Sequence, residues 1–551
     1  MNKESRERLK VWMPLLFSLV LIFGMILGFN LRDTLRNKRD ITKVMQRNDR
    51  LEEIIDLINE KYADTVNSDV LYKDAISGIL KTLDPHTLYF PAEEVEGINN
   101  DLEGGFSGIG IEFSIVRDTI DVTSVIENGP AGHAGVAIGD QLIKVGDSVV
   151  AGKNITAERI TGLLKGKQHS SVDITLKLAS NSSFKKLPII RDIIPTYSVE
   201  ASIMLDSVTG FIKINRFTAT TYTEFTAALI KLKDLGAKQL VLDLRDNPGG
   251  YLDAATSIAD DFLDDNKLIV YTQGVHSTKT EYKSTGKGLF EQGRLAVLMD
   301  EGSASASEIF AGSIQDWDRG VIIGRRSFGK GLVQEQYEMP DGSAIRLTIA
   351  KYYTPSGRCI QRSFSNGREA YEQDFEKRFE TVALTGRDTD NVTDTVPFYT
   401  ANHRIVYGGG GIKPDVYVPY DTSRISPLLL NMIFSEELKT AIWDYFLQNR
   451  TKLNFKNAGE FNSLFEGENG IVSSYLAMLK PEIHKRVLKE LSIPSDKEYF
   501  DLQIKAQVAR FLFHDNGYYA ISMKQDEVVN KALAVLKSDE YTKLLHPVSG
   551  K

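Results

Sequence analysis

The sequence predicts a multidomain protein built around an α/β core, and three observations carry that prediction. The chain has 551 residues, 42% hydrophobic and 25% charged, which is typical of folded proteins of roughly three or four domains. In its middle part, apolar strand-like runs alternate with helical patterns, as in an α/β core with a partly parallel sheet. Short strands and turns precede this core, and the apolar spacing after it is helical.

An apolar stretch near the N-terminus predicts a membrane anchor over residues 1–30. Val11 to Phe29 carries no charged residue, and ~20 apolar residues suffice to span a membrane. Neither a small-residue cleavage site nor a cysteine for lipid attachment follows it, which favours an uncleaved signal anchor. Basic residues lie on both sides, so charge alone does not decide the orientation. Because a short basic tail usually stays in the cytoplasm, we expect the body of the chain in the periplasm or an equivalent extracytoplasmic space.

Residues 31–103 are predicted to be a helical segment. Apolar residues recur at helical spacing around Leu51–Ile58 and again around Leu71–Leu80. The turn at Pro85 breaks this pattern, and His86 follows it directly. His86 stands alone beside the proline, so we interpret it as a structural hydrogen-bonding group rather than a catalytic residue.

Residues 104–185 read as one small module of short strands and turns. Its glycine loop is Gly108-Ile109-Gly110-Ile111, and a Gly-Pro-Ala turn and a Gly-Asp-x-Leu-Ile-x-Val-Gly strand follow. This stretch resembles a PDZ domain. The resemblance implies that backbone N–H groups of the loop bind the terminal carboxylate of a peptide, which adds as a strand to a sheet edge. The alternative is a tight strand entry without a ligand, and the missing third glycine argues against a dinucleotide loop.

The α/β core is expected over residues 186–423, with an insertion or loop near 365–400 that is polar and highly charged. Glycine-containing turns follow three of its apolar strands, and such turns are where open α/β sheets place active sites. These turns are Arg245–Gly250, Gly302–Ile309 and Ser327–Gly331.

Two of these turns point to nucleophilic catalysis. Ser305 follows a strand and a tight turn at the start of a predicted helix, and Lys330 lies on a glycine loop after the next strand. A serine and a lysine presented this way can act as nucleophile and base without a histidine. Burial lowers the pKa of a lysine, so that its neutral amine can accept the serine proton. The structural alternative is that Ser305 and Glu308 form only a capping box.

Other chemistries are disfavoured by residue type and charge. The run Gly324–Gly331 nearly matches a phosphate-binding loop, but Gly331 stands where serine or threonine is needed to hold magnesium. The eight histidines show no metal-binding spacing, and a single cysteine excludes a disulfide framework. We therefore expect no metal and no cofactor. A net charge of −8 argues against nucleic acid as a partner.

The order of these elements resembles the C-terminal processing, or tail-specific, peptidases from near Leu71 to near Ser423. The segments that carry the resemblance are Asp-Leu-Arg-Asp-Asn-Pro-Gly-Gly from residue 243, Gly-Ser-Ala-Ser-Ala-Ser-Glu from residue 302 and Phe-Gly-Lys-Gly-x-x-Gln from residue 328. The resemblance implies a Ser-Lys serine endopeptidase that cleaves exported proteins near their C-termini after a PDZ domain captures the tail. Its expected partners are proteins with accessible C-termini, and the membrane through the N-terminal span.

The resemblance also implies roles for individual residues. Ser305 would be the nucleophile, Lys330 the base, and Gln334 the residue that positions Lys330. The Ala306 N–H and one N–H from Gly249 or Gly250 would bind the oxyanion, and the pattern does not choose between the two glycines.

Two interpretations remain open at this point. The chain could be a non-catalytic PDZ scaffold that binds peptides, although Ser305, Lys330 and Gln334 are all present. The helical region at residues 424–551 is interpreted as a buttress or a homodimer-forming module, with an adaptor-binding module as the alternative.

Overall fold

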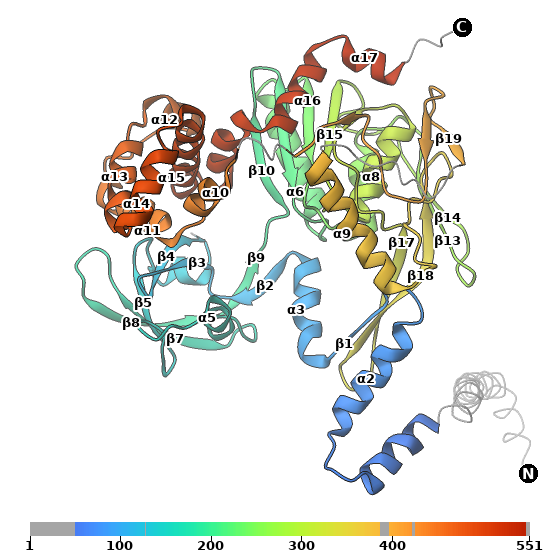
Figure 1. Cartoon of the computed structure of the whole chain (residues 1–551), viewed down its shortest axis with the longest axis horizontal. Coiled ribbons are helices and arrows are strands. Elements are labelled where there is room, and N and C mark those ends of the chain that lie inside the picture. The colour runs from blue at the N-terminus through green and yellow to red at the C-terminus, as the bar shows by residue number, and fades with distance from the viewer. Residues whose placement is uncertain (1–49, 127, 386–395, 421–424, 547–551) are drawn as a thin grey trace, which may run out of the picture. The chain divides into compact units, whose positions relative to one another are not determined.

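The structure is a computed structural model, and its described residues are 50–126, 128–385, 396–420 and 425–546 (Figure 1). It divides into two compact units, residues 1–83 and 84–551. In the first unit, residues 50–61 are helical and α2 spans Ser68–Leu80, in line with the helical spacing. The predicted anchor over residues 1–30 lies outside the described residues. Among the helices that are described, none is both long and apolar enough to cross a membrane.

A six-stranded sheet forms the core of the second unit, in the order β10-β11-β12-β15-β16-β21. β10 pairs antiparallel with β11, and all the other neighbours are parallel. The carboxyl ends of the parallel strands therefore lie at one edge, where open sheets place their functional loops. The strands are β10 (Val199–Met204), β11 (Thr209–Ile214), β12 (Gln239–Asp243), β15 (Arg294–Met299), β16 (Val321–Gly324) and β21 (Val416–Tyr417).

Helices cover both faces of this sheet. Leu240 and Leu242 on β12 pack into one apolar cluster, whereas Val241 between them packs into another on the opposite face. The first cluster includes α6 (Thr221–Asp234), α7 (Leu252–Asp260) and α8 (Ala306–Asp316), and the second includes α16 (Glu527–Lys537) and α17 (Glu540–Leu545). The C-terminal region predicted as one helical unit thus divides, because its last two helices form a layer of the core.

A five-stranded antiparallel sheet accompanies the first, in the order β1-β18-β13-β14 with β17 paired to β18. β1 comes from the segment predicted as helical, and its Leu88 lies opposite Arg346 on β18. The turn at Pro85 therefore leads into a strand of the core. The strands are β1 (Leu88–Phe90), β13 (Leu268–Gln273), β14 (Thr280–Lys283), β17 (Leu332–Glu338) and β18 (Ala344–Tyr353).

The strand-rich module predicted over residues 104–185 has its own sheet and apolar cluster. The sheet order is β3-β4-β5-β7-β8, with β6 paired to β5, so β3 is an edge strand. Its cluster includes Ile120, Leu142 and Ile174, all fully buried. The elements are β3 (Ile111–Val116), β4 (Thr119–Val125), α4 (Pro130–His133), β5 (Gln141–Val145), β6 (Ser148–Val149), α5 (Ala157–Leu164), β7 (Ser171–Lys177) and β8 (Phe184–Ile190). Helix α3 (Ala92–Glu103) precedes a ribbon of β2 (Gly105–Gly108) and β9 (Asp192–Pro195).

The segment near 365–400 is not simply a loop. It contains a helix, α9 (Arg368–Thr385), and strand β19 (Pro397–Tyr399), which pairs with β20 (Ile405–Tyr407). The helix is anchored by Tyr371, which is buried and packs edge-on against Phe328. Because the segment is polar and carries no apolar helical period, spacing could not reveal this helix.

Helices α10 to α15 form a separate apolar cluster in the C-terminal region. Val116 of the strand-rich module is buried in this cluster, and Arg117 pairs with Asp444 on α11. Helix α15 is interrupted at Phe513 and His514, where the backbone is not helical. The helices are α10 (Pro427–Ile433), α11 (Glu436–Asn449), α12 (Ala458–Leu464), α13 (Glu468–Met478), α14 (Pro481–Glu490) and α15 (Pro494–Ser522), followed by a 3-10 turn at Met523–Gln525.

Candidate active site

The three glycine turns start from neighbouring strands of the parallel sheet. β12, β15 and β16 pair in that order and run in the same direction. The turns that follow them carry Gly249 and Gly250, Ser305, and Lys330 respectively. Parallel topology therefore brings together segments that are far apart in the sequence.

Ser305 occupies a sharp turn between β15 and α8. It is the N-cap residue of α8, and its backbone has φ +55° and ψ −113°, a conformation rare for a residue with a Cβ. Such strain costs ~1–3 kcal/mol and persists only where neighbours enforce it. The preceding Ala304 N–H donates to the carbonyl of Asn247 (2.9 Å), and the Ser303 hydroxyl donates to the carbonyl of Leu244 (2.8 Å). The turn that carries Ser305 is thus bound to the turn that follows β12.

Glu308 joins the serine turn to the lysine loop. Its Oε2 accepts the backbone N–H groups of Ser305 (2.8 Å) and Lys330 (2.9 Å). Its Oε1 accepts the Ser327 hydroxyl (2.5 Å) and the Gly329 N–H (2.7 Å). The Glu308 half of the expected capping box is present, since the carboxylate accepts the Ser305 N–H, but this carboxylate does more than cap a helix. Its bonds to the lysine loop could not be predicted from sequence, because these partners follow it by about twenty residues along the chain.

The Glu308 side chain is fully buried. Burial raises the pKa of this carboxyl to about 7, although its bonds from Ser327, Lys330, Gly329 and Ser305 all favour the ionised form. An acceptor with four donors is satisfied only as a carboxylate, since a protonated oxygen would itself become a donor.

Lys330 has the environment that a neutral amine requires. Burial lowers its pKa, and the charge of Arg346 lowers it further, against the opposing charges of Glu308 and Asp84. Lys330 forms no ion pair with any residue in the described parts of the chain. Its carbonyl accepts the Tyr352 hydroxyl (2.6 Å), and this hydroxyl also lies 3.1 Å from the Ser305 carbonyl.

Gln334 lies on β17, next to an irregularity in its pairing with β18. Its Nε2 donates to the carbonyl of His86 (2.6 Å), so the amide binds the turn after Pro85. No hydrogen bond between Gln334 and Lys330 exists among the described residues, and its role in positioning the amine stays a prediction.

His86 lies close to this site, which its sequence context did not indicate. Its Nε2 is 3.0 Å from the hydroxyl of Tyr371, and its ring packs edge-on against Phe328 and Tyr371. Burial, followed by the charge of Lys330, lowers the pKa of His86 to about 4. His86 is therefore neutral at pH 7, and its contacts are those expected of a structural hydrogen-bonding group.

The two candidate oxyanion glycines differ in their bonds. The Gly249 N–H donates to the side chain of Asn247 (2.9 Å), so it is already used. A Cβ added to Gly249 would lie 2.8 Å from both the Ser305 Cβ and the Ala306 nitrogen, so this glycine touches the turn that carries Ser305. Within the described residues, the N–H groups of Gly250 and Ala306 have no acceptor. These two donors are thus available to a ligand beside Ser305.

The glycine loop of the strand-rich module lies where β2 ends and β3 begins. Gly108 is the last residue of β2, and Ile111 is the first of β3. Ile109 is buried and its carbonyl accepts the Ala131 N–H (2.8 Å), while Gly110 has φ +80°, which favours glycine. Because β3 has a strand neighbour on one side only, an edge for strand addition exists beside this loop.

Three family descriptions match the chain. Peptidase family S41 matches residues 208–367, a PDZ domain matches residues 122–178, and a family of unknown function matches residues 429–515. The first match contains all three turns of the site, and the second contains most of the strand-rich module.

Relatives from two Staphylococcus species carry the same description. The chain is 33% identical over 366 residues to a "Probable CtpA-like serine protease" of Staphylococcus epidermidis, covering 65% of this chain and 73% of that protein. A protein of the same description from Staphylococcus aureus is 33% identical over 370 residues, covering 65% and 72%. Among solved structures, the photosystem II D1 C-terminal processing protease is 26% identical with a TM-score of 0.33, covering 56% of this chain and 89% of that chain.

Proposed function

The chain belongs to peptidase family S41 as a C-terminal processing serine protease, and from this premise we propose that Ser305 and Lys330 form its catalytic dyad. One observation carries the dyad: a single oxygen, Glu308 Oε2, accepts the backbone N–H groups of both residues. The two backbones therefore meet at one point. The non-catalytic scaffold is not retained, because the family is one of serine peptidases.

Lys330 acts as the general base in this proposal. Its lowered pKa favours the neutral amine, which in this mechanism accepts the Ser305 Oγ proton as Oγ attacks the scissile carbonyl. The resulting ammonium then donates a proton to the leaving amine, and an acyl-enzyme remains on Ser305. Water attacks this ester with Lys330 again as base, which restores both residues.

The oxyanion is held by the backbone N–H groups of Ala306 and Gly250. Gly249 is disfavoured because its N–H already donates to Asn247. Fixed N–H dipoles beside the nucleophile stabilise the charge that develops on the carbonyl oxygen, and each such donor is typically worth ~10²–10³ in rate.

The PDZ domain selects the end of the substrate. A C-terminal carboxylate would bind the loop Gly108-Ile109-Gly110-Ile111, and the preceding residues would add as a strand to the free edge of β3. The substrates would be exported proteins with accessible C-termini, if residues 1–30 anchor the chain with its body outside the cytoplasm. Digestion of intact and permeabilised cells by an added protease tests that orientation.

The decisive experiment compares the full-length protein with its Ser305→Ala and Lys330→Ala variants. The substrate is an unfolded test protein, supplied either with a free C-terminal carboxylate or with an amidated C-terminus. We expect Lys330→Ala to lose ~10²–10⁴ in kcat, the range for removing a general base, and Ser305→Ala to lose at least as much because it has no nucleophile, both at unchanged melting temperature. Amidation should raise KM, because the carboxylate is the group that the loop recognises.

Each part of the proposal can be contradicted by a separate result. Cleavage by Ser305→Ala at the wild-type rate would remove the nucleophile assignment, and cleavage by Lys330→Ala would remove the base. Equal KM for the free and amidated substrates would remove tail capture while leaving the dyad intact.

A further inference from the structure

A buried network of charged side chains lies at the start of the turn that carries Gly250. Asp243 ends β12, is fully buried, and accepts hydrogen bonds from the Arg245 side chain through Nε (3.0 Å) and Nη2 (2.6 Å). Lys213 Nζ donates to the carbonyl of Arg245 (3.0 Å). Arg245 is thus held by its side chain and its backbone, five residues before Gly250.

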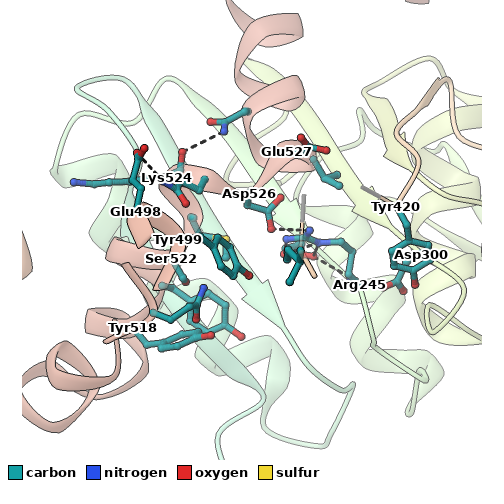
Figure 2. A pocket seen from close by; sticks show the side chains of 18 of the residues that line it. Arg245, Asp300, Tyr420, Glu498, Tyr499, Tyr518, Ser522, Lys524, Asp526 and Glu527 are labelled. Carbon is teal, nitrogen blue, oxygen red and sulfur yellow. Dashed lines mark hydrogen bonds and ion pairs between the residues drawn. The ribbon is translucent and has the colours of Figure 1, made fainter. Parts of the chain in front are cut away.

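The remaining guanidinium nitrogen of Arg245, Nη1, contacts the C-terminal region. This nitrogen donates to Asp526 Oδ2 (2.9 Å; Figure 2). Both side chains are more than four-fifths buried. Asp526 is also the N-cap of α16, because its Oδ1 accepts the Val529 N–H (2.9 Å). One carboxylate therefore fastens the start of α16 with one oxygen and Arg245 with the other.

Helix α16 is itself fixed to the sheet. Val529 and Ala532 are fully buried against it, and Arg294 on β15 donates to the Leu536 carbonyl (2.6 Å). Asp526 therefore presents its carboxylate from a rigid support. The network contains two cations, Lys213 and Arg245, and two anions, Asp243 and Asp526, so loss of one anion leaves a largely buried guanidinium without its second partner.

We propose that Asp526 is a positioning residue of the protease: by holding Arg245, it fixes the turn that presents the Gly250 N–H to the oxyanion. The C-terminal region then completes the active site rather than only supporting the fold. The inference rests on the proposed function, in which Gly250 is an oxyanion donor. None of the three matched family segments reaches residue 526.

The Asp526→Asn variant isolates this role. Asparagine is as good an N-cap as aspartate, so α16 keeps its first-turn hydrogen bond while the charge is lost. The pair also borders a wide cavity, so the substitution leaves no hole in a packed core (Figure 2). Lys537→Gln is the control. It breaks another ion pair of α16, the one between Lys537 and Asp206, which lies in the turn between β10 and β11.

The measurement is kcat and KM of the full-length variants on the unfolded test protein, with thermal unfolding alongside. We expect Asp526→Asn to lower kcat about tenfold or more with KM unchanged, since even a ~1 Å misplacement can cost ~10²-fold. Lys537→Gln should keep the wild-type kcat, and Asp526→Glu should recover much of the loss because it restores the charge.

Two outcomes would overturn the inference. One is a wild-type kcat in Asp526→Asn. The other is an equal loss in Asp526→Asn and Lys537→Gln together with a lower melting temperature, which would mean that docking of α16 in general matters. The Ser305→Ala variant keeps this test separate from the proposed function: if it still cleaves, the function fails, whereas an inactive Ser305→Ala with a fully active Asp526→Asn removes only the role of Asp526.

Discussion

The two turns beside Ser305 are held in place by opposite means. The turn at residues 245–250 is braced by charges, since Asp243 and Asp526 bind the Arg245 side chain and Lys213 binds its carbonyl. The loop at residues 327–331 is instead held through neutral donors. Glu308, a buried carboxylate, accepts three of them, and the Gly331 N–H donates to the Gln361 side chain. At the centre of this loop, Lys330 has no ion pair within the described chain.

In the proposed mechanism, the difference follows from what each turn must supply. An oxyanion turn presents backbone N–H dipoles that do not titrate, so ionic groups around it can add rigidity without changing its chemistry. A base must be able to lose its proton, and a carboxylate paired with its amine would stabilise the ammonium and raise the pKa. For Lys330, burial and the charge of Arg346 outweigh the opposing charges of Glu308 and Asp84.

Among changes that test this comparison, the largest effect is expected from Gly250→Ala, which alters the turn at residues 245–250. An added Cβ would lie 1.9 Å from the carbonyl oxygen of Phe217, and φ at Gly250 is +143°. The turn must therefore shift and withdraw its N–H from the oxyanion. We expect kcat on the unfolded test protein to fall by ~10²–10³, the usual cost of one lost oxyanion donor.

The control for this change is Gly236→Ala. Gly236 also has a positive φ (+99°), but the nearest atom to an added Cβ is the Ser207 carbonyl oxygen at 3.7 Å. This variant should lose some stability and keep its kcat. A Gly250→Ala protein as active as Gly236→Ala would show that the turn tolerates movement, and the contrast between the two turns would break.

A smaller effect is expected from Glu308→Gln, which attacks the lysine loop. Glutamine has nearly the same shape, but its NH₂ group cannot accept the donors that one carboxylate oxygen now accepts. Each buried donor left unpaired costs ~1–3 kcal/mol, so the melting temperature should fall. Because Ser305 and Lys330 share Oε2, we also expect kcat to fall by about tenfold through their misalignment.

Asp318→Asn serves as the control at the other end of α8. Asp318 is a buried carboxylate that pairs with Arg404, away from the three turns. Its loss should lower the melting temperature without changing kcat. If Glu308→Gln behaves in the same way, the carboxylate is a structural group only, and the two turns are aligned by something else.

The grouping of the candidate site's turns could be predicted because it follows from local patterns. Ser305 and Lys330 each stand in a glycine turn after an apolar strand, and parallel topology is enough to bring such turns to one edge. The choice between Gly249 and Gly250 could not be made from sequence, because it depends on which N–H the Asn247 side chain occupies. That bond has no signature in residue spacing.

The contributions that sequence missed come from distant segments. Tyr371 reaches His86 from a polar helix without apolar periodicity, and Asp526 reaches Arg245 across 281 residues. Single long-range contacts of polar side chains leave no periodic pattern, unlike the apolar alternation along β12 that correctly indicated a strand. The multidomain α/β architecture was therefore predictable, whereas the connections between its parts were not.

The smallest expected effect tests how the charge of Arg346 influences the pKa of Lys330. Cleavage should rise with pH through the pKa of Lys330, since only its neutral amine can accept the Ser305 proton. The positive charge of Arg346 disfavours protonation of Lys330, so Arg346→Gln should raise that pKa and move the rising limb of kcat/KM to higher pH. We expect a shift of less than one pH unit. A full unit would require that this single charge contribute ~1.4 kcal/mol to the protonation equilibrium of Lys330.

The measurement is a pH profile of kcat/KM for the wild type and the Arg346→Gln variant, with Lys283→Gln as control. Lys283 is an exposed cation on β14 of the same five-stranded sheet, so its loss should leave the limb in place. His86 does not confuse the result, because its pKa of about 4 keeps it neutral across the limb. A limb that stays fixed or moves to lower pH would show that the charge of Arg346 does not lower the pKa of Lys330. The proposed electrostatic difference between the two turns would then be wrong.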